Sequence, residues 1–183
     1  MAVATCFAAQ PAPIRKGIQV SSAPLSVEHV KITTTKPYAE VKAGIETLGR
    51  IDDGVRASFA EKLKNNGVEG LRGSLEKIAG EDGLTIMFAV PHGDFLALKG
   101  ERRPLTAYLI GNALSAVEMT KINPAAGLYA PLRVVVYAND LGGTTMEYDK
   151  PSTMFGQFRD PEIDATARSL DQRLLVFLTK AGS

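Results

Sequence analysis

Several short segments of this chain carry the hydrophobic patterns of β-strands. Residues 27–35, VEHVKITTT, alternate apolar and polar side chains and are rich in Val and Thr, as expected for a half-buried strand. The run LTIMFAV is continuously apolar and stands between turn signals, which favours a central strand, and LRVVVY is strongly β-branched. A turn over residues 139–143 then leads to a hairpin partner. The predicted strands are residues 27–35, 84–90, 105–110, 132–137 and 144–148.

Other segments repeat their apolar residues at the spacing of an amphipathic helix. A first helix is predicted after Pro37, a residue that suits the first helical turn. Its apolar stripe is Tyr38, Val41, Ile45 and Leu48. Residues 52–82 favour two shorter helices, with a break at the Asn-Asn-Gly of residues 65–67 and an end at Gly80.

The C-terminal helix has the clearest start and stop signals. Asp160 can accept hydrogen bonds from the first free N–H groups, Pro161 suits the first helical position, and Gly182 suits the end. Its buried stripe is predicted to be Ile163, Ala167, Leu170, Leu174 and Phe177. Ser115 and Glu118 have the spacing of a capping box, which predicts the start of a shorter helix there.

The order of these elements favours an α+β fold. The strands follow one another too closely for repeated βαβ units, so we expect a mostly antiparallel sheet with helices on one face. The chain would run strand, helix, a helical insertion at residues 52–82, strands with a short crossover helix, a hairpin and a long helix. We expect one domain over residues 26–183, preceded at residues 1–25 by a flexible or loosely docked arm that contains three prolines, Pro11, Pro13 and Pro24.

Composition and charge narrow the range of partners. The 183 residues are 45% hydrophobic, enough for a core, and the formal net charge is +1 from 21 basic and 20 acidic residues. This balance gives no long-range attraction to nucleic acid or to an acidic membrane, and no apolar stretch approaches the length of a membrane span. We therefore expect no nucleic-acid partner and no membrane partner. The single cysteine, Cys6, cannot form an intramolecular disulfide, which favours a reducing, cytoplasmic location.

A series of motifs lies between residues 92 and 151. They are His92, Gly111-Asn112, Asn123-Pro124, Ala126-Gly127-Leu128, Pro131-Leu132-Arg133-Val134, Tyr137, Tyr148 and Pro151. In order and spacing, these motifs resemble the bacterial domain-of-unknown-function family 302. The resemblance implies a TATA-binding-protein-like α+β fold, with a curved antiparallel sheet and helices on one face, and it implies a homodimer. It implies no activity, because none is established for the family, and a shared topology says nothing about DNA binding.

His92 is the first candidate for chemistry. It follows a predicted buried strand, and imidazole titrates near neutral pH, which suits acid–base catalysis. Asp94 could orient the ring, and Tyr148 or Asn112 could donate a hydrogen bond to an oxyanion. The ordinary alternative is a histidine that satisfies backbone groups at the end of a strand. A single histidine without a second partner defined by sequence favours that alternative.

Further residues are candidates for ligand contacts. Asn112 stands before a helix start, where free N–H groups can face an anion, although the capping box there favours a plain cap. Arg103, in a polar loop with Lys99 and Arg102, could bind a carboxylate or phosphate, or it could simply be solvated. Tyr108 could line a pocket from its strand, or it could belong to the core or its rim. 

Arg133 lies on a predicted strand between Leu132 and Val134, so its side chain faces the opposite way from theirs. It would point to solvent or to a carboxylate of a partner at a dimer interface. Metal ligands are not indicated, because His29 and His92 are far apart in sequence and no His or Cys cluster exists. No nucleotide-binding fingerprint is present either, so we expect no metal and no cofactor.

Three functions fit these patterns. The first is binding of a small apolar or amphipathic molecule in a pocket between sheet and helices, with His92, Asn112 and Tyr148 at its mouth. The second is a metal-independent acid–base enzyme, such as an isomerase, cyclase or lyase, that uses His92. The third is a dimeric interaction protein whose interface is the flat face or an edge of the sheet.

Overall fold

The computed structural model describes residues 17–183. Cys6 and most of the predicted arm therefore lie outside the described residues. Residues 18–28 form neither helix nor strand and are exposed to solvent. The first regular element, β1 (His29–Thr34), begins directly after them.

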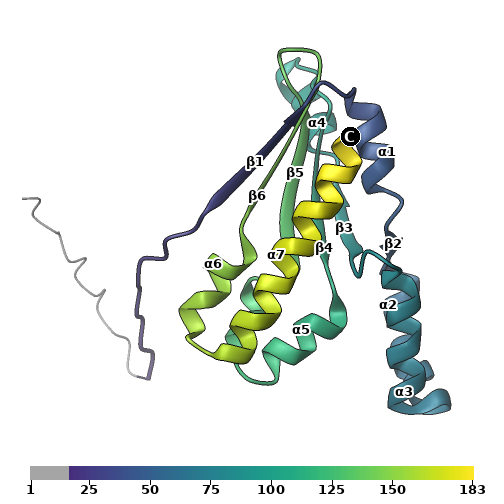
Figure 1. Cartoon of the computed structure of the whole chain (residues 1–183), viewed down its shortest axis with the longest axis vertical. Coiled ribbons are helices and arrows are strands. Elements are labelled where there is room, and N and C mark those ends of the chain that lie inside the picture. The colour runs from purple at the N-terminus through teal and green to yellow at the C-terminus, as the bar shows by residue number, and fades with distance from the viewer. Residues whose placement is uncertain (1–16) are drawn as a thin grey trace, which may run out of the picture.

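A six-stranded sheet forms the centre of the fold (Figure 1), in the order β1-β6-β5-β4-β3-β2. Neighbouring strands are antiparallel, except that the short β2 is parallel to β3. The strands after β1 are β2 (Gly49–Arg50), β3 (Thr85–Val90), β4 (Leu105–Gly111), β5 (Leu132–Ala138) and β6 (Thr144–Asp149). The predicted α+β class with a mostly antiparallel sheet is confirmed.

Helices cover one face of this sheet. The long α7 lies across the strands, with α1 beside it and α5 and α6 packed against α7 (Figure 1). These helices are α1 (Tyr38–Ile45), α5 (Ala113–Thr120), α6 (Pro151–Phe155) and α7 (Pro161–Gly182). The 3₁₀ turns η2 (Pro124–Leu128) and η3 (Gly156–Phe158) follow α5 and α6.

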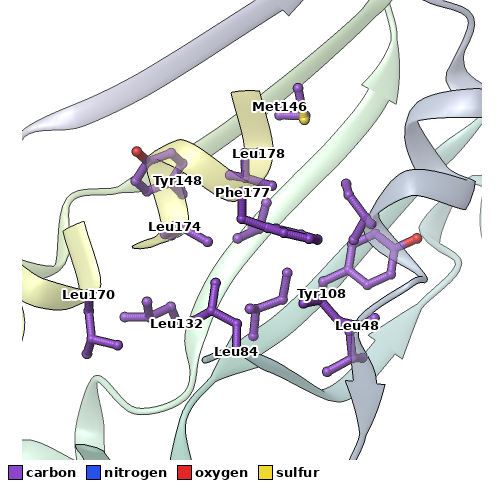
Figure 2. Packing of buried hydrophobic residues seen from close by; sticks show 14 of the residues in the cluster. Leu48, Leu84, Tyr108, Leu132, Met146, Tyr148, Leu170, Leu174, Phe177 and Leu178 are labelled. Atoms are coloured by element: carbon purple, nitrogen blue, oxygen red, sulfur yellow. The ribbon is translucent and has the colours of Figure 1, made fainter. Parts of the chain in front are cut away.

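The hydrophobic core fills the space between α7 and the sheet (Figure 2). All five residues of the predicted stripe on α7 are buried: Ile163, Ala167, Leu170, Leu174 and Phe177. They meet the inward-facing side chains of the central strands, among them Val134 and Val136 of β5 and Met146 of β6. Successive residues of a strand point to opposite faces, so the residues between these belong to the other face of the sheet.

The segment predicted to hold two helices is helical, but its two elements are divided at Ser58 and not at residues 65–67. These are α2 (Asp53–Ala57) and α3 (Phe59–Ala79). The predicted break appears inside α3 at Gly67, whose φ of 67° and ψ of −173° are not helical, and glycine adopts a positive φ without the steric cost that other residues meet. Gly80 ends α3 as predicted, with a φ of 59°.

Two short elements join β3 to β4. They are α4 (His92–Phe95) and the 3₁₀ turn η1 (Leu96–Lys99). Gly93 lets α4 lie tightly against the start of β4, because a Cβ at this position would come within 2.2 Å of the carbonyl oxygen of Arg103. This packing fixes His92 just beyond the end of β3.

The predicted capping box at Ser115 and Glu118 is wrong. Helix α5 begins earlier, and its N-cap is Asn112, whose side-chain oxygen accepts a hydrogen bond from the backbone N–H of Ser115 at 2.8 Å. Glu118 instead forms an ion pair with Lys121. Asn is as good an N-cap as Ser, and Asn112 has the extended backbone that a cap requires.

Candidate ligand-binding site on the open face of the sheet

The face of the sheet that α7 does not cover is called the open face here. Strand register aligns its outward-pointing side chains in two adjacent rows across the sheet. The first row consists of Phe88, Leu109, Arg133, Asp149 and His29. The second row consists of Val90, Ala107, Val135, Glu147 and Lys31. Each row thus runs from apolar side chains on β3 to charged ones on β1.

All of these residues except Lys31 line a hollow of about 480 Å³, which is called the open-face hollow below. Its floor is apolar and comes from the central strands β3, β4 and β5. The floor residues are Phe88, Val90, Ala107, Leu109 and Val135. The side chain of Phe88 is 56% exposed, although aromatic rings usually lie in the core.

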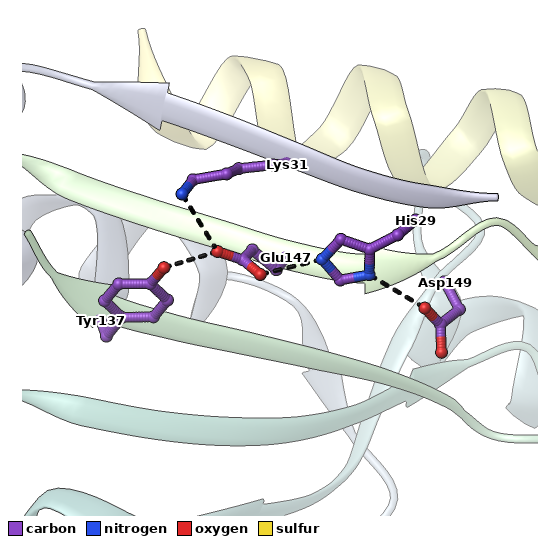
Figure 3. A network of polar contacts seen from close by, with 5 residues as sticks. All are labelled: His29, Lys31, Tyr137, Glu147 and Asp149. Atoms are coloured by element: carbon purple, nitrogen blue, oxygen red, sulfur yellow. Dashed lines mark hydrogen bonds and ion pairs between the residues drawn. The ribbon is translucent and has the colours of Figure 1, made fainter.

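Three lining residues of the hollow, His29, Glu147 and Asp149, belong to a polar network, which Figure 3 shows. The His29 ring lies between two carboxylates, with Nδ1 at 3.0 Å from Asp149 Oδ1 and Nε2 at 2.9 Å from Glu147 Oε2. Tyr137 donates its hydroxyl to Glu147 Oε1 at 2.5 Å, and the ammonium of Lys31 lies 3.6 Å from the same oxygen. Antiparallel pairing of β6 with β1 on one side and with β5 on the other brings these residues together.

These contacts shift the ionisation of the network. The hydrogen bonds to Asp149 and then to Glu147 raise the pKa of His29 above its ordinary value of 6.5. The hydrogen bonds from Tyr137 and then from His29 lower the pKa of the Glu147 carboxyl. The network therefore favours a charged imidazolium held between two carboxylates.

His92 lies at the opposite end of the open-face hollow. Its ring meets Phe95 edge to face, with centroids 6.3 Å apart. Within residues 17–183, no hydrogen bond joins His92 to Asp94. Asp94 is exposed and borders a different hollow, of about 420 Å³, together with Arg102 and Arg103. The chain has two histidines, and both line the open-face hollow, one at each end.

The two tyrosines predicted as site residues direct their side chains to the core on the helix-covered side. Tyr148 is 4% exposed and belongs to the cluster in Figure 2, and burial raises its pKa to about 12. Tyr108 is 1% exposed, and its hydroxyl donates to Glu46 at 3.4 Å. Both occupy inward-facing strand positions, so the structure places their phenol groups on the other side of the sheet from His92.

The remaining predicted ligand contacts have structural partners. Arg103 donates to the Asp140 carboxylate at 2.9 Å, in the loops at one end of the sheet. Asn112 caps α5 and also donates its amide to the carbonyl of Gly83 at 2.8 Å. It borders a smaller hollow of about 220 Å³ between the end of the sheet and the helices.

Sequence reasoning missed the network around His29. Glu147 and Asp149 stand two residues apart on a strand and so share a face, and His29 occupies an outward position on β1. That His29 lies beside these two carboxylates can be inferred only when β1 is known to pair with β6. Within residues 17–183, no three His, Cys, Asp or Glu side chains gather as metal ligands, since the nitrogens of His29 face different carboxylates.

Comparison with known proteins identifies the family. A family profile described as "Domain of unknown function DUF302" matches residues 59–181, more than half of the chain. The chain belongs to the DUF302 family. The strand β1 and the helix α1 of this DUF302 protein precede the matched residues, so His29 lies outside the match.

A solved DUF302 structure has the same fold. The chain is similar to an uncharacterised conserved DUF302 protein from Bacillus stearothermophilus, with a TM-score of 0.56 and 18% sequence identity. The alignment covers 85% of this chain and 98% of the other. No match was found among the curated proteins. None of the helices in residues 17–183 is both long and apolar enough to cross a membrane.

Proposed function

We propose that this DUF302 protein binds a small amphipathic molecule in the open-face hollow. The observation that carries the proposal is an apolar floor on the central strands with polar groups at both ends. The apolar part of the ligand would pack on Ala107, Leu109 and Val135, and its removal from water is favourable. A polar group of the ligand would form hydrogen bonds with the polar residues at the rim.

The size of the hollow supports the proposal. Its volume of about 480 Å³ falls within the range of roughly 300–1,000 Å³ that is usual for small-molecule sites. The hollow of about 220 Å³ between sheet and helices is below this range. A floor built by a sheet favours a flat ring system or an extended alkyl chain over a globular ligand.

The strand sequences give independent support. LTIMFAV carries apolar side chains on both of its faces, a pattern typical of strands that are covered on both sides. The helices cover only one of these faces. An apolar ligand would shield the side chains of Phe88 and Val90 from water, as helices do on the other face.

A neutral fluorescent dye tests the proposal. N-phenyl-1-naphthylamine is a flat apolar molecule, and we expect the protein to bind it saturably with a stoichiometry of one dye per chain. Val135→Asp places a carboxylate in the middle of the floor. A bound dye would desolvate this carboxylate, which is unfavourable. We expect this change to weaken binding about tenfold or more, equivalent to about 1.4 kcal/mol.

The matched control is Val176→Asp. Val176 lies on α7 and is 66% exposed, so the same substitution there leaves the hollow intact. Circular dichroism of both variants checks that they are folded, and we expect spectra equal to that of the unmodified protein. The absence of saturable binding to the unmodified protein, or equal binding by the Val135→Asp protein, would refute the proposed function.

A further inference from the structure

We propose that the open-face hollow selects an amphipathic molecule with an oxyanion head, such as a carboxylate or phosphate, and that Arg133 binds this head. The inference rests on the proposed function and names the class of ligand. Arg133 is then a ligand-binding residue, whereas its sequence position indicated solvent or a partner carboxylate as its neighbour.

Arg133 projects from the floor of the hollow. It lies on β5, opposite Leu109 of β4, and the next outward residue on its own strand is Val135. Its neighbours Leu132 and Val134 are buried under the helices, whereas Arg133 is exposed. A planar guanidinium with five N–H donors therefore stands beside an apolar surface, an arrangement that matches a flat ligand with an anionic head.

The guanidinium of Arg133 has no protein partner within residues 17–183. No carboxylate there forms an ion pair with it, and no hydrogen bond takes up its N–H groups. Some other arginines do have partners, since Arg103 pairs with Asp140 and Arg50 pairs with Glu46. Arg133 thus lines the hollow and has N–H donors that are unpaired within residues 17–183.

The two acids that line the hollow are already engaged. Asp149 and Glu147 both bind His29, and Glu147 also faces Lys31 and Tyr137. When His29 is protonated, the positive charges of His29 and Lys31 balance the two carboxylates. The charge of Arg133 is then not neutralised, so the net charge of these five residues is positive and attracts an anion.

A pair of dyes with one ring system tests this selectivity. 8-Anilinonaphthalene-1-sulfonate is N-phenyl-1-naphthylamine with an added sulfonate, so the ratio of the two dissociation constants isolates the contribution of the oxyanion. We expect Arg133→Gln to shift this ratio about tenfold against the sulfonate dye, because hydrogen bonds to charged groups are lost. Binding of the neutral dye should change less than twofold.

Arg102→Gln is the control, since Arg102 is an exposed arginine outside the open-face hollow. It should leave the ratio unchanged. Competition for the bound sulfonate dye by 1-naphthoate and by 1-naphthyl phosphate then distinguishes a carboxylate head from a phosphate head. Displacement by either supports the inference, and 1-naphthylmethanol should displace far less.

The outcomes separate the two proposals. If neither dye binds saturably, the proposed function fails. If the neutral dye binds but the ratio in Arg133→Gln equals that of the unmodified protein, only the role of Arg133 is overturned. A dimer that excludes both dyes, and that Val135→Asp converts to a monomer, would show that a second copy covers the face and would overturn the inference.

Discussion

At the scale of single residues, the His29 network couples stability to pH in two opposite ways. The pKa of His29 is raised in the folded state, so its contacts stabilise the protein fully below the ordinary pKa of 6.5 and less as the pH rises through the raised value. The pKa of Glu147 is lowered, so its contacts are complete above the ordinary 4.5 and are lost as the pH falls through the lowered value.

The contribution of His29 should therefore be largest in mildly acidic solution. We expect the difference in free energy of unfolding between the unmodified protein and His29→Gln to be greatest between about pH 5 and pH 6. It should shrink steadily above neutral pH, as the imidazolium loses its proton. Urea unfolding at several pH values measures this difference.

His92→Gln is the control for this pH series. His92 makes no hydrogen bond or ion pair within residues 17–183, so its substitution should change stability little at any of these pH values. A difference for His29→Gln that stays constant with pH would contradict the assignment of a charged imidazolium between Glu147 and Asp149.

Sequence alone could foresee some side-chain directions but not this network. The outward orientation of Arg133 was predicted from strand alternation, and it is confirmed. His29 and Glu147 are separated by 118 residues, and no local pattern states which strands pair. The sequence therefore indicates candidate site residues around His92, whereas the polar network of His29, Glu147 and Asp149 lies at the other end of the hollow.

At the scale of elements, the start of α7 is determined by Asp160. One side-chain oxygen accepts hydrogen bonds from the N–H groups of Glu162 at 2.9 Å and Ile163 at 3.1 Å. Asp160→Ala removes this cap, and we expect the free energy of unfolding to fall by about 1 kcal/mol. Glu162→Ala, which removes an acidic side chain of the same turn but no cap, should cost less in the same urea titration.

Two adjacent leucines of α7 test how this helix packs on the sheet. Leu174 is fully buried, whereas Leu175 is 46% exposed. Leu174→Ala leaves a cavity between helix and sheet, and we expect it to cost about 2–5 kcal/mol. Leu175→Ala should cost far less, and similar values for the two variants would contradict the orientation of α7.

Elements with long periodic patterns were predictable, and short ones were not. The stripe of α7 and the break at Gly67 follow from the sequence because each depends on residues close together in the chain. The strand β2 has two residues, too few to show a period. The capping-box spacing of Ser115 and Glu118 predicts a helix start at Ser115. Asn112, one turn earlier, is also a good N-cap residue, and the helix begins there.

At the scale of the whole molecule, the fold class followed from element order, but the position of the hollow did not. The predicted pocket lay between sheet and helices, where the packed core leaves a hollow of about 220 Å³, smaller than the open-face hollow of about 480 Å³. Helices α1, α5, α6 and α7 lie on one side of the sheet (Figure 1), which leaves the apolar outer face of β3–β5 uncovered. Element order predicts helices on one face of the sheet, but it does not predict that the uncovered face carries the hollow. The homodimer stays a prediction.

The pairing of β1 with β6 has a consequence for how the molecule is made. His29 and Asp149 are 120 residues apart, so the ribosome completes β1 long before its partner exists. Contacts between distant parts of a chain form slowly because a large loop must close first. The polar end of the open-face hollow therefore forms only after β6 has been made, and a nascent chain or a polypeptide truncated before β6 lacks it.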